Sequence, residues 1–257
     1  MQQNIKERLQ GVEQRYAVRI IYACESGSRA WGFPSPDSDY DVRFIYAHPA
    51  HHYLSVFTGS DVIEAKLDAV YDIAGWDIIK ACDLMRKSNC ALLEWLSSPM
   101  VYQTHDAIVP LQELAHQSFR PHSACHHYAA LARGKWLDIK ATATPHVKAY
   151  LYALRASLCC LSIIKHRTAP PMIMQDMIPG HIPGDLRKTV DAILRQKKTA
   201  LESATTDRRP DLDAFIQQAI TDAANAPPNA ADQPVAFYNQ AFRDCLAALW
   251  GNTVTLR

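Results

Sequence analysis

The sequence predicts an α+β fold, in which a mixed sheet with helices comes first and an all-helical part follows. Segments rich in β-branched and aromatic residues, the pattern of strands, occur only in about the first 105 of the 257 residues. Beyond them helical spacing recurs, and prolines separate several of the expected helices. Because the length exceeds the roughly 100–150 residues of a typical domain, we expect two domains, residues 1–105 and 106–257.

The first domain is expected to alternate between helices and strands. Strand composition is clear in AVRIIYAC (17–24) and YDVRFIYA (40–47), and two prolines indicate a loop at 33–39 between them. Asp77 is expected in the first turn of one helix and Asn89 at the N-cap of the next. The expected elements are helices over 2–14, 76–87 and 89–96, a helical turn within 27–32, and strands over 17–24, 40–47 and 62–73.

The second domain is expected to be helical throughout. A stretch rich in Ala, Asn and Pro around 223–234 indicates a loose connector before the last helix. The helical patterns cover 106–117, 121–141, 146–167, 184–204, 210–224 and 234–250.

Composition describes a globular protein with an uneven charge distribution. The chain has 27 Lys and Arg, 26 Asp and Glu, and 48% hydrophobic residues, which excludes disorder, collagen-like repeats and coiled coil as the main organisation. Residues 1–110 hold 10 basic and 14 acidic side chains, a net of −4, whereas 133–167 hold seven basic and one acidic, a net of +6. This pattern fits a metal-binding part beside a part that holds an anionic polymer or nucleotide, and it also fits a solvated helix face.

The sequence indicates a cytoplasmic protein without membrane contact. No apolar run approaches the roughly 20 residues of a membrane helix, and the polar N-terminus is unlike a signal peptide. The seven cysteines are scattered and form no C-x-x-C pair, which is typical of buried thiols in a reducing compartment. No dimerisation signal stands out, so a monomer is the default expectation.

The segment 26–43 carries the candidate chemistry. Gly27 and Ser28 follow a strand and open a helical turn, where backbone N–H groups can bind phosphate. Asp39 and Asp41 share one face if the strand 40–47 extends to them, since side chains alternate along a strand. Two adjacent carboxylates stay ionised at low cost when a cation lies between them, and oxygen ligands suit Mg²⁺ or Mn²⁺. An exposed, polar strand start is the alternative interpretation of the pair.

In combination, these features resemble the nucleotidyltransferase superfamily that includes DNA polymerase beta. GSRAWGFPSPDSDYDVRFIY (27–46) is similar to a predicted nucleotidyltransferase family associated with RNA repair. That family also shows a G-W-D helix with an N-x-x-L-L-E-W-L stretch, here within 74–102, and a segment that stands here as KAYLYALR (148–155). The resemblance covers roughly residues 20–170. A P-loop is excluded, since no G-x-x-x-x-G-K-[ST] occurs.

The resemblance implies a polymerase-beta-like palm and metal-dependent transfer of an NMP from an NTP to a hydroxyl, expected to be on an RNA end, with release of pyrophosphate. It implies that Gly27 and Ser28 hold the triphosphate and that Asp39 and Asp41 ligate two metal ions, Mg²⁺ or Mn²⁺. It also requires a third catalytic carboxylate that ligates metal. Asp72 is our choice for it, because it lies in the strand-like VYDI. Asp68 is second and Glu64 third.

Five basic or aromatic residues complete the nucleotide-binding candidates. Arg29 and Arg43 can meet phosphate or pair with neighbouring aspartates, and for Arg43 we favour pairing. Lys148, Tyr152 and Arg155 share one side of the helix 146–167, where cations can neutralise phosphate and a tyrosine can stack on a base. Two alternatives stay open: nucleotidyl transfer to a protein or small molecule, and a non-catalytic RNA- or nucleotide-binding module.

Overall fold

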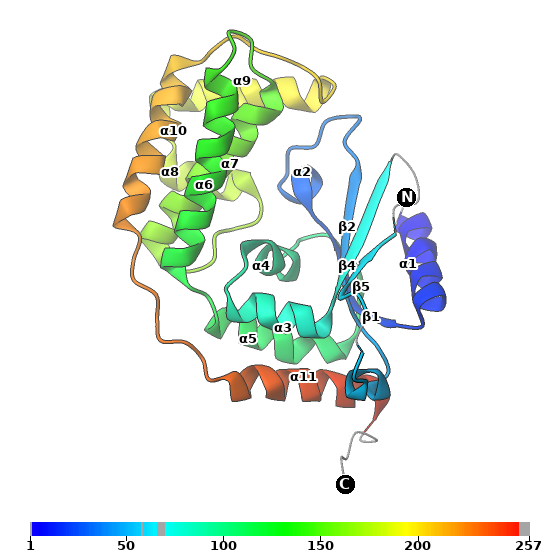
Figure 1. The fold of residues 1–257 in the computed structure, drawn as a ribbon. Helices are drawn as coiled ribbons and strands as arrows, with labels where there is room; N and C mark the ends of the chain where they lie inside the picture. Colours follow the sequence, from blue (N-terminus) through cyan, green and yellow to red (C-terminus); the bar gives the residue numbers. More distant parts are fainter. Residues whose placement is uncertain (1, 58, 66–69, 252–257) are drawn as a thin grey trace. The chain divides into compact units, whose positions relative to one another are not determined.

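A computed structural model describes residues 2–57, 59–65 and 70–251, and its fold is α+β as predicted. The chain forms two compact units (Figure 1). The sheet unit consists of Met1–Gly27, Asp39–Ser118 and Ala231–Arg257, and the helical unit consists of Ser28–Ser38 and Phe119–Ala230.

The sheet unit is built around five strands in the order β3-β4-β2-β1-β5, in which β2 and β4 are parallel and the other neighbours antiparallel. Its strands are β1 (Arg19–Glu25), β2 (Tyr40–Ala47), β3 (Val62–Glu64), β4 (Tyr71–Asp77) and β5 (Val101–Thr104). Its helices are α1 (Gln2–Tyr16), α3 (Ile78–Arg86), α4 (Cys90–Leu96), α5 (Val109–Gln117) and α11 (Val235–Trp250), with 3₁₀ turns at Ala50–Leu54 and Asp106–Ile108.

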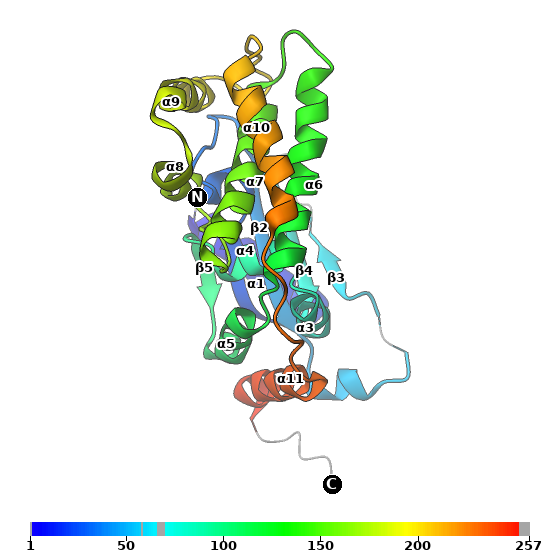
Figure 2. The same ribbon diagram turned by 90° about the vertical axis from the view of Figure 1, so that its left-hand side faces the viewer.

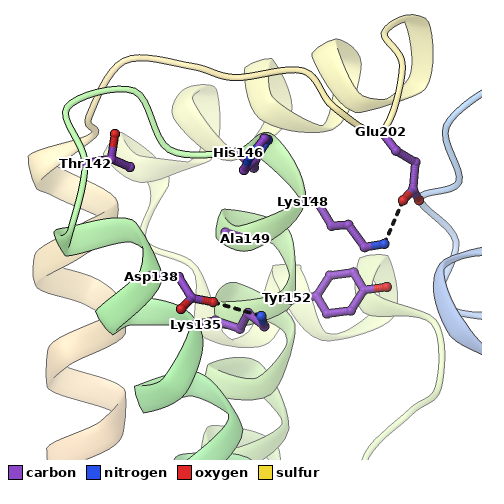
Figure 3. A pocket seen from close by; sticks show the side chains of 8 residues that line it. All are labelled: Lys135, Asp138, Thr142, His146, Lys148, Ala149, Tyr152 and Glu202. Atoms are coloured by element: carbon purple, nitrogen blue, oxygen red, sulfur yellow. Dashed lines mark hydrogen bonds and ion pairs between the residues drawn. The ribbon is translucent and has the colours of Figure 1, made fainter.

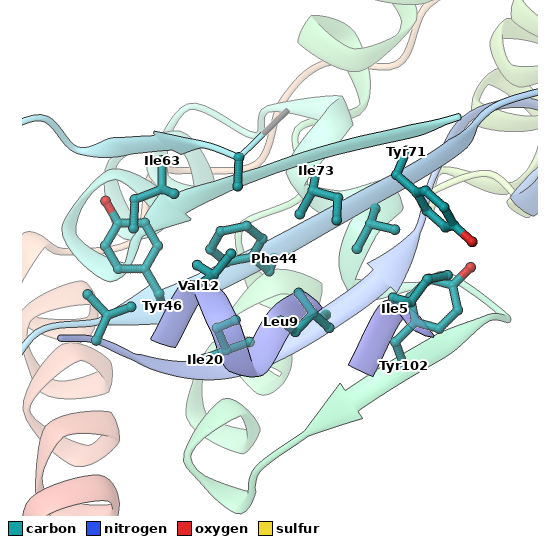
Figure 4. Packing of buried hydrophobic residues seen from close by; sticks show 14 residues of the cluster. Ile5, Leu9, Val12, Ile20, Phe44, Tyr46, Ile63, Tyr71, Ile73 and Tyr102 are labelled. Carbon is teal, nitrogen blue, oxygen red and sulfur yellow. The ribbon is translucent and has the colours of Figure 1, made fainter. Parts of the chain in front are cut away.

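The core of the sheet unit lies between α1 and one face of the sheet. Ile5 and Leu9, from one side of α1, belong to the same buried cluster as Phe44 of β2 and Ile73 of β4 (Figure 4). Side chains alternate along a strand, so the residues next to Phe44 and Ile73 point to the opposite face of the sheet. This alternation places the candidate residues of β2 and β4 on the face away from α1.

Two features of the sheet differ from the sequence prediction. The expected single strand 62–73 is two antiparallel strands, β3 and β4. The sequence between them contains no Gly, Pro or Asn, so the pattern does not indicate a break between two strands. β4 continues to Asp77, which caps α3 by accepting the backbone N–H of Ile79, so the helix begins two residues later than expected.

One short strand and one short α-helix were not predicted at all. β5 is only four residues long, too short for strand alternation to stand out. The helix α8 (Met174–His181) contains Pro179 and follows two further prolines, which conceal its helical signal. Asn89, in contrast, is the expected N-cap of α4 and accepts the backbone N–H of Leu92.

The helical unit contains α6 (Pro121–Lys140), α7 (Val147–His166), α8, α9 (Gly184–Thr199) and α10 (Pro210–Asp222), with a 3₁₀ turn at Ala223–Asn225. In Figures 1 and 2, α6, α7 and α10 run side by side. Among the described residues α7 alone has the length and hydropathy of a membrane span, contrary to the expectation that no run reaches that length. However, 72% of its apolar window is buried inside the protein, as in a core helix.

The four-residue helix α2 (Gly27–Ala30) spans the point where the chain passes from the sheet unit to the helical unit. The segment 28–38 then packs within the helical unit: Met174 donates its N–H to the carbonyl of Trp31, and the Trp31 and Tyr152 rings meet edge-on at 5.0 Å. The assignment of domains to 1–105 and 106–257 stays a prediction. By contact, α5 and α11 pack together in the sheet unit.

Candidate functional site

The carboxylates of Asp41 and Asp72 lie side by side on the sheet unit. The two residues are in register on the parallel strands β2 and β4. Arg43, two residues after Asp41, places its Nη2 3.3 Å from Asp41 Oδ1 and 2.7 Å from Asp72 Oδ2. Its Nη1 donates to the carbonyl of Asp72 at 2.8 Å. We call these three residues the carboxylate cluster; it holds two negative charges around one positive charge.

Gly27 is required by the close approach of Asp41. Its φ is +61°, in the region that favours glycine, and a Cβ added to it would lie 2.1 Å from Asp41 Oδ2. The neighbouring Ser26 donates its N–H to the carbonyl of Asp41 at 2.8 Å. Gly27 therefore leaves the space that the Asp41 carboxylate occupies, a steric role that the sequence pattern did not reveal.

Glu25, at the end of β1, is a buried carboxylate that sequence reasoning missed. It is 0% exposed, and its Oε1 accepts the N–H of Asp41 at 3.0 Å while its Oε2 accepts the hydroxyl of Tyr102. Ser98 donates its hydroxyl to the Glu25 carbonyl at 2.7 Å. The Asp41 N–H and the Tyr102 hydroxyl satisfy the buried carboxyl group, and the first of these contacts fixes the backbone at Asp41. A charged residue directly after the apolar run of β1 was the available signal.

The remaining carboxylate candidates are exposed or lie outside the described residues. Asp39 is exposed in the segment before β2, and Glu64 is exposed at the end of β3. Asp68 lies outside the described residues. Within the ranges that the structure describes, no group of three or more His, Cys, Asp and Glu side chains is placed to hold a metal ion. The roles of Asp39, Asp41 and Asp72 as metal ligands stay predictions.

Ser28 and Arg29 hydrogen-bond to Ser38, at the other end of the loop that leads to Asp39 and Asp41. The Ser28 hydroxyl is buried and donates to Ser38 Oγ at 3.3 Å, and Arg29 Nη2 donates to the Ser38 carbonyl at 2.6 Å. Ser35 Oγ lies 2.9 Å from the same Ser38 hydroxyl. Both predicted phosphate-binding residues therefore contact the start of the Asp39 segment, and their roles toward phosphate stay predictions.

Lys148, at the start of α7, belongs to a cluster in which one carboxylate serves two ammonium groups. Glu202 Oε2 accepts from Lys148 Nζ at 2.6 Å, and Glu202 Oε1 lies 3.3 Å from Lys197 Nζ. Lys197 is 1% exposed and also donates to Ser35 Oγ at 2.8 Å. Burial by itself would raise the pKa of Glu202, but the two lysines and the Ser38 hydroxyl lower it below its ordinary value. We call Lys148, Lys197 and Glu202 the lysine cluster.

Arg155 and Tyr152 of α7 differ in their exposure. Arg155 is 4% exposed, with its guanidinium 4.3 Å from the centre of the Trp31 ring and its Nη2 donating to the Met172 carbonyl. Tyr152 is half-buried and lines a cavity with Lys148. The structure thus brings Lys148 and Tyr152 together at the cavity, while Trp31 of the segment 28–38 packs against both Tyr152 and Arg155. A role of Arg155 in nucleotide binding stays a prediction.

The chain is similar to proteins of a known family. A model of the RNA repair pathway DNA polymerase beta family, RlaP, matches residues 1–244. This chain belongs to the RlaP family. It is 39% identical over 225 residues to the uncharacterized protein YcgL of Bacillus subtilis (strain 168), a match that covers 86% of this chain and 85% of YcgL. A solved nucleotidyltransferase-like protein from Exiguobacterium sibiricum 255-15 matches with 12% identity and a TM-score of 0.30, over 95% of this chain and 78% of that one.

Membership in the RlaP family confirms the resemblance that residues 27–46 indicate. The protein is a nucleotidyltransferase of the polymerase beta superfamily.

Proposed function

We propose that this member of the RlaP family transfers an NMP from an NTP to a hydroxyl of an RNA end and releases pyrophosphate. The observation that carries the proposal is the carboxylate cluster, in which Asp41 and Asp72 are held in register on neighbouring strands. The family description supports an RNA acceptor, because it names an RNA repair pathway. In support of a reducing cytoplasm as the location, all seven cysteines are buried thiols. A monomeric state stays a prediction.

The donor set of the carboxylate cluster fits a hard divalent ion. Its ligating atoms are all carboxylate oxygens, and Asp41 and Asp72 already surround a cationic group, the Arg43 guanidinium. Asp39, Asp41 and Asp72 would hold two Mg²⁺ or Mn²⁺ ions. When bound, such ions neutralise charge on the transferring phosphoryl group and lower the pKa of the acceptor hydroxyl.

The chain's own residues supply position and charge. Gly27 leaves room for Asp41, and Glu25 holds the Asp41 backbone, so the carboxylate keeps one direction. The backbone at Gly27 and Ser28 would bind the triphosphate. Arg43 Nη1 donates to the Asp72 carbonyl. This contact would hold Arg43 in place if its Nη2 left the Asp41 and Asp72 carboxylates for another partner. The acceptor oxygen bonds to the α-phosphorus, the bond to the pyrophosphate oxygen breaks, and the hydroxyl proton leaves to solvent.

The test is a double variant, Asp39→Ala with Asp41→Ala. Pyrophosphate release from each NTP with Mg²⁺ should disappear in this variant, while Asp61→Ala, an exposed carboxylate paired with Lys80, should behave like the wild type. Wild-type turnover in the double variant would refute the mechanism. Labelled NTP, followed by separation of RNA, protein and metabolite fractions, identifies the acceptor. Label in the protein or metabolite fraction alone would overturn the assignment to RNA.

A further inference from the structure

A cavity of about 400 Å³ lies within the helical unit, between the end of α6, the start of α7 and the chain around Glu202 (Figure 3). Its lining combines two lysines, two carboxylates, a histidine and an aromatic ring: Lys135, Lys148, Asp138, Glu202, His146 and Tyr152. The volume is at the small end of the range for small-molecule sites, and it suits one nucleotide rather than a peptide or a lipid.

Each lysine of the cavity is paired with one of its carboxylates. Lys135 Nζ lies 2.9 Å from Asp138 Oδ2, one turn along α6, and Lys148 Nζ lies 2.6 Å from Glu202 Oε2 (Figure 3). Both side chains of the Lys135–Asp138 pair are exposed, and exposed ion pairs contribute little to the free energy of folding. An anionic ligand can therefore recruit Lys135 at little cost, and the cost at Lys148 decides whether the cavity binds anions.

Glu202 has other hydrogen-bond donors besides Lys148. Its Oε1 has two other donors, the buried ammonium of Lys197 at 3.3 Å and the Ser38 hydroxyl at 3.1 Å. Its backbone N–H is fixed by Asp37 Oδ1 at 2.9 Å. Lys148 is the exposed ammonium of the pair, at 41% against 1% for Lys197. If Lys148 moves to another anion, Glu202 stays hydrogen-bonded and charge-compensated in place.

We propose that this cavity binds a single nucleotide through its phosphate and base, and that Glu202 occupies Lys148 until the phosphate replaces it. The identity of the ligand rests on the proposed nucleotidyl transfer; the exchange at Lys148 rests on the lysine cluster alone. Phosphate is a ligand that ammonium groups bind well. Tyr152, whose ring packs edge-on against Trp31 at 5.0 Å and has Lys148 Nζ 5.5 Å from its centre, provides an aromatic ring for a base. The nucleotide belongs either to the free NTP or to the end of the RNA acceptor.

Equilibrium binding without divalent ions tests the exchange. ATP, AMP, adenosine, inorganic phosphate and a short oligoribonucleotide are titrated into the full chain by calorimetry in the presence of a chelator. Lys148→Ala should weaken binding of phosphate-bearing nucleotides by about tenfold, the loss expected for one charge-assisted hydrogen bond. Glu202→Gln should tighten it, because the amide keeps an acceptor for Ser38 but no longer competes for Lys148. Lys188→Ala, an exposed lysine of α9, serves as the matched control and should bind like the wild type.

The ligands separate the two sources of the nucleotide. A change confined to ATP assigns the cavity to the NTP, and a change confined to the oligoribonucleotide assigns it to the acceptor end. Equal affinity of Lys148→Ala, Glu202→Gln and wild type for every ligand overturns the proposal, provided thermal unfolding shows the variants folded. Loss of adenosine binding equal to that of AMP would also overturn it, since the exchange requires a phosphate.

Pyrophosphate release is measured in parallel and keeps the two proposals apart. If the Asp39/Asp41 double variant is inactive while Lys148→Ala binds nucleotides normally, the cavity assignment fails and the proposed function stands. If the double variant is active, the proposed function fails, whatever the cavity binds. The double variant itself should bind ATP in chelator like the wild type, because it leaves the cavity lining unchanged.

Discussion

The carboxylate cluster of the sheet unit and the lysine cluster of the helical unit are built with opposite charges. In the sheet unit one guanidinium, Arg43, serves two carboxylates. In the helical unit one carboxylate, Glu202, serves two ammonium groups. Each cluster thus carries one charge more than its internal partners cancel, negative in the first and positive in the second.

In both clusters the most exposed side chain carries the sign of charge that is in excess. Asp72 is 48% exposed while Arg43 is 19%, and Lys148 is 41% exposed while Lys197 is 1%. The least exposed member of each cluster has a further contact within the protein, to the Asp72 carbonyl for Arg43 and to Ser35 Oγ for Lys197. The excess negative charge of the sheet unit would suit a cation and the excess positive charge of the helical unit an anion, as the proposed metal-dependent transfer of a nucleotide requires.

The largest expected effect is on the carboxylate cluster. Asp72→Asn removes one of the two registered charges and should reduce pyrophosphate release by at least about a hundredfold, as for the loss of one preorganised electrostatic group. Glu64→Gln, an exposed carboxylate of β3, should change the rate little. Steady-state kinetics with increasing Mn²⁺ check the result. If Glu64→Gln is the inactive variant and Asp72→Asn the active one, the third carboxylate has been misassigned.

Residues 26–43 were the part of the site that the sequence could predict. Gly27, Asp41 and Arg43 are close in the chain, and strand alternation is enough to place Asp41 and Arg43 on one face. Placing Asp72 beside Asp41 required the pairing register between β2 and β4, which no local sequence pattern encodes. It was chosen from its strand-like surroundings, although the strand around it was predicted with the wrong limits.

The supporting residues were beyond sequence reasoning because their partners are remote. Glu25 meets Tyr102, on a strand too short to be predicted, and Glu202 meets Lys148 and Ser38 across 54 and 164 positions of the chain. Glu202 itself lies in a segment that the sequence assigned to a helix, whereas α9 ends at Thr199. Burial decides the role of such residues, and burial depends on tertiary contacts that local periodicity does not report.

A second, smaller effect is expected at Gly27, whose conformation gives the carboxylate cluster its space. Gly27→Ala places a methyl group against Asp41 at positive φ, so unfolding free energy should fall by about 1–3 kcal/mol and activity should fall with it. Gly11→Ala is the matched control, since nothing lies within 4 Å of its added Cβ on α1. That control should raise stability by up to about 1 kcal/mol. Chemical denaturation measures both, and equal effects would remove the steric argument.

A comparable or smaller loss of stability is expected at Lys197, the buried member of the lysine cluster. Lys197→Met removes the donor to Ser35 Oγ and one partner of Glu202, so unfolding free energy should fall by about 1–2 kcal/mol. The loss is limited because Lys148 still compensates Glu202. Lys198→Met, at the exposed neighbouring position, is the control. Equal denaturation midpoints for the two variants would show that the ammonium of Lys197 does not hold the cluster.

The smallest expected effect is the pH dependence that Glu202 contributes. Its pKa is lowered in the folded protein, because the two lysines and Ser38 outweigh the burial that would raise it. The unfolded chain therefore takes up this proton first as pH falls, so the stabilisation is present above the ordinary glutamate value of 4.5 and is lost below it. Glu202→Gln cannot take up the proton, so the stability difference between wild type and this variant should shrink on acidification. Thermal unfolding of both proteins across this range measures the difference. A constant difference would mean that the charge of Glu202 does not bind the lysine cluster together, and the contrast with the carboxylate cluster would then rest on Lys148 and Lys197 alone.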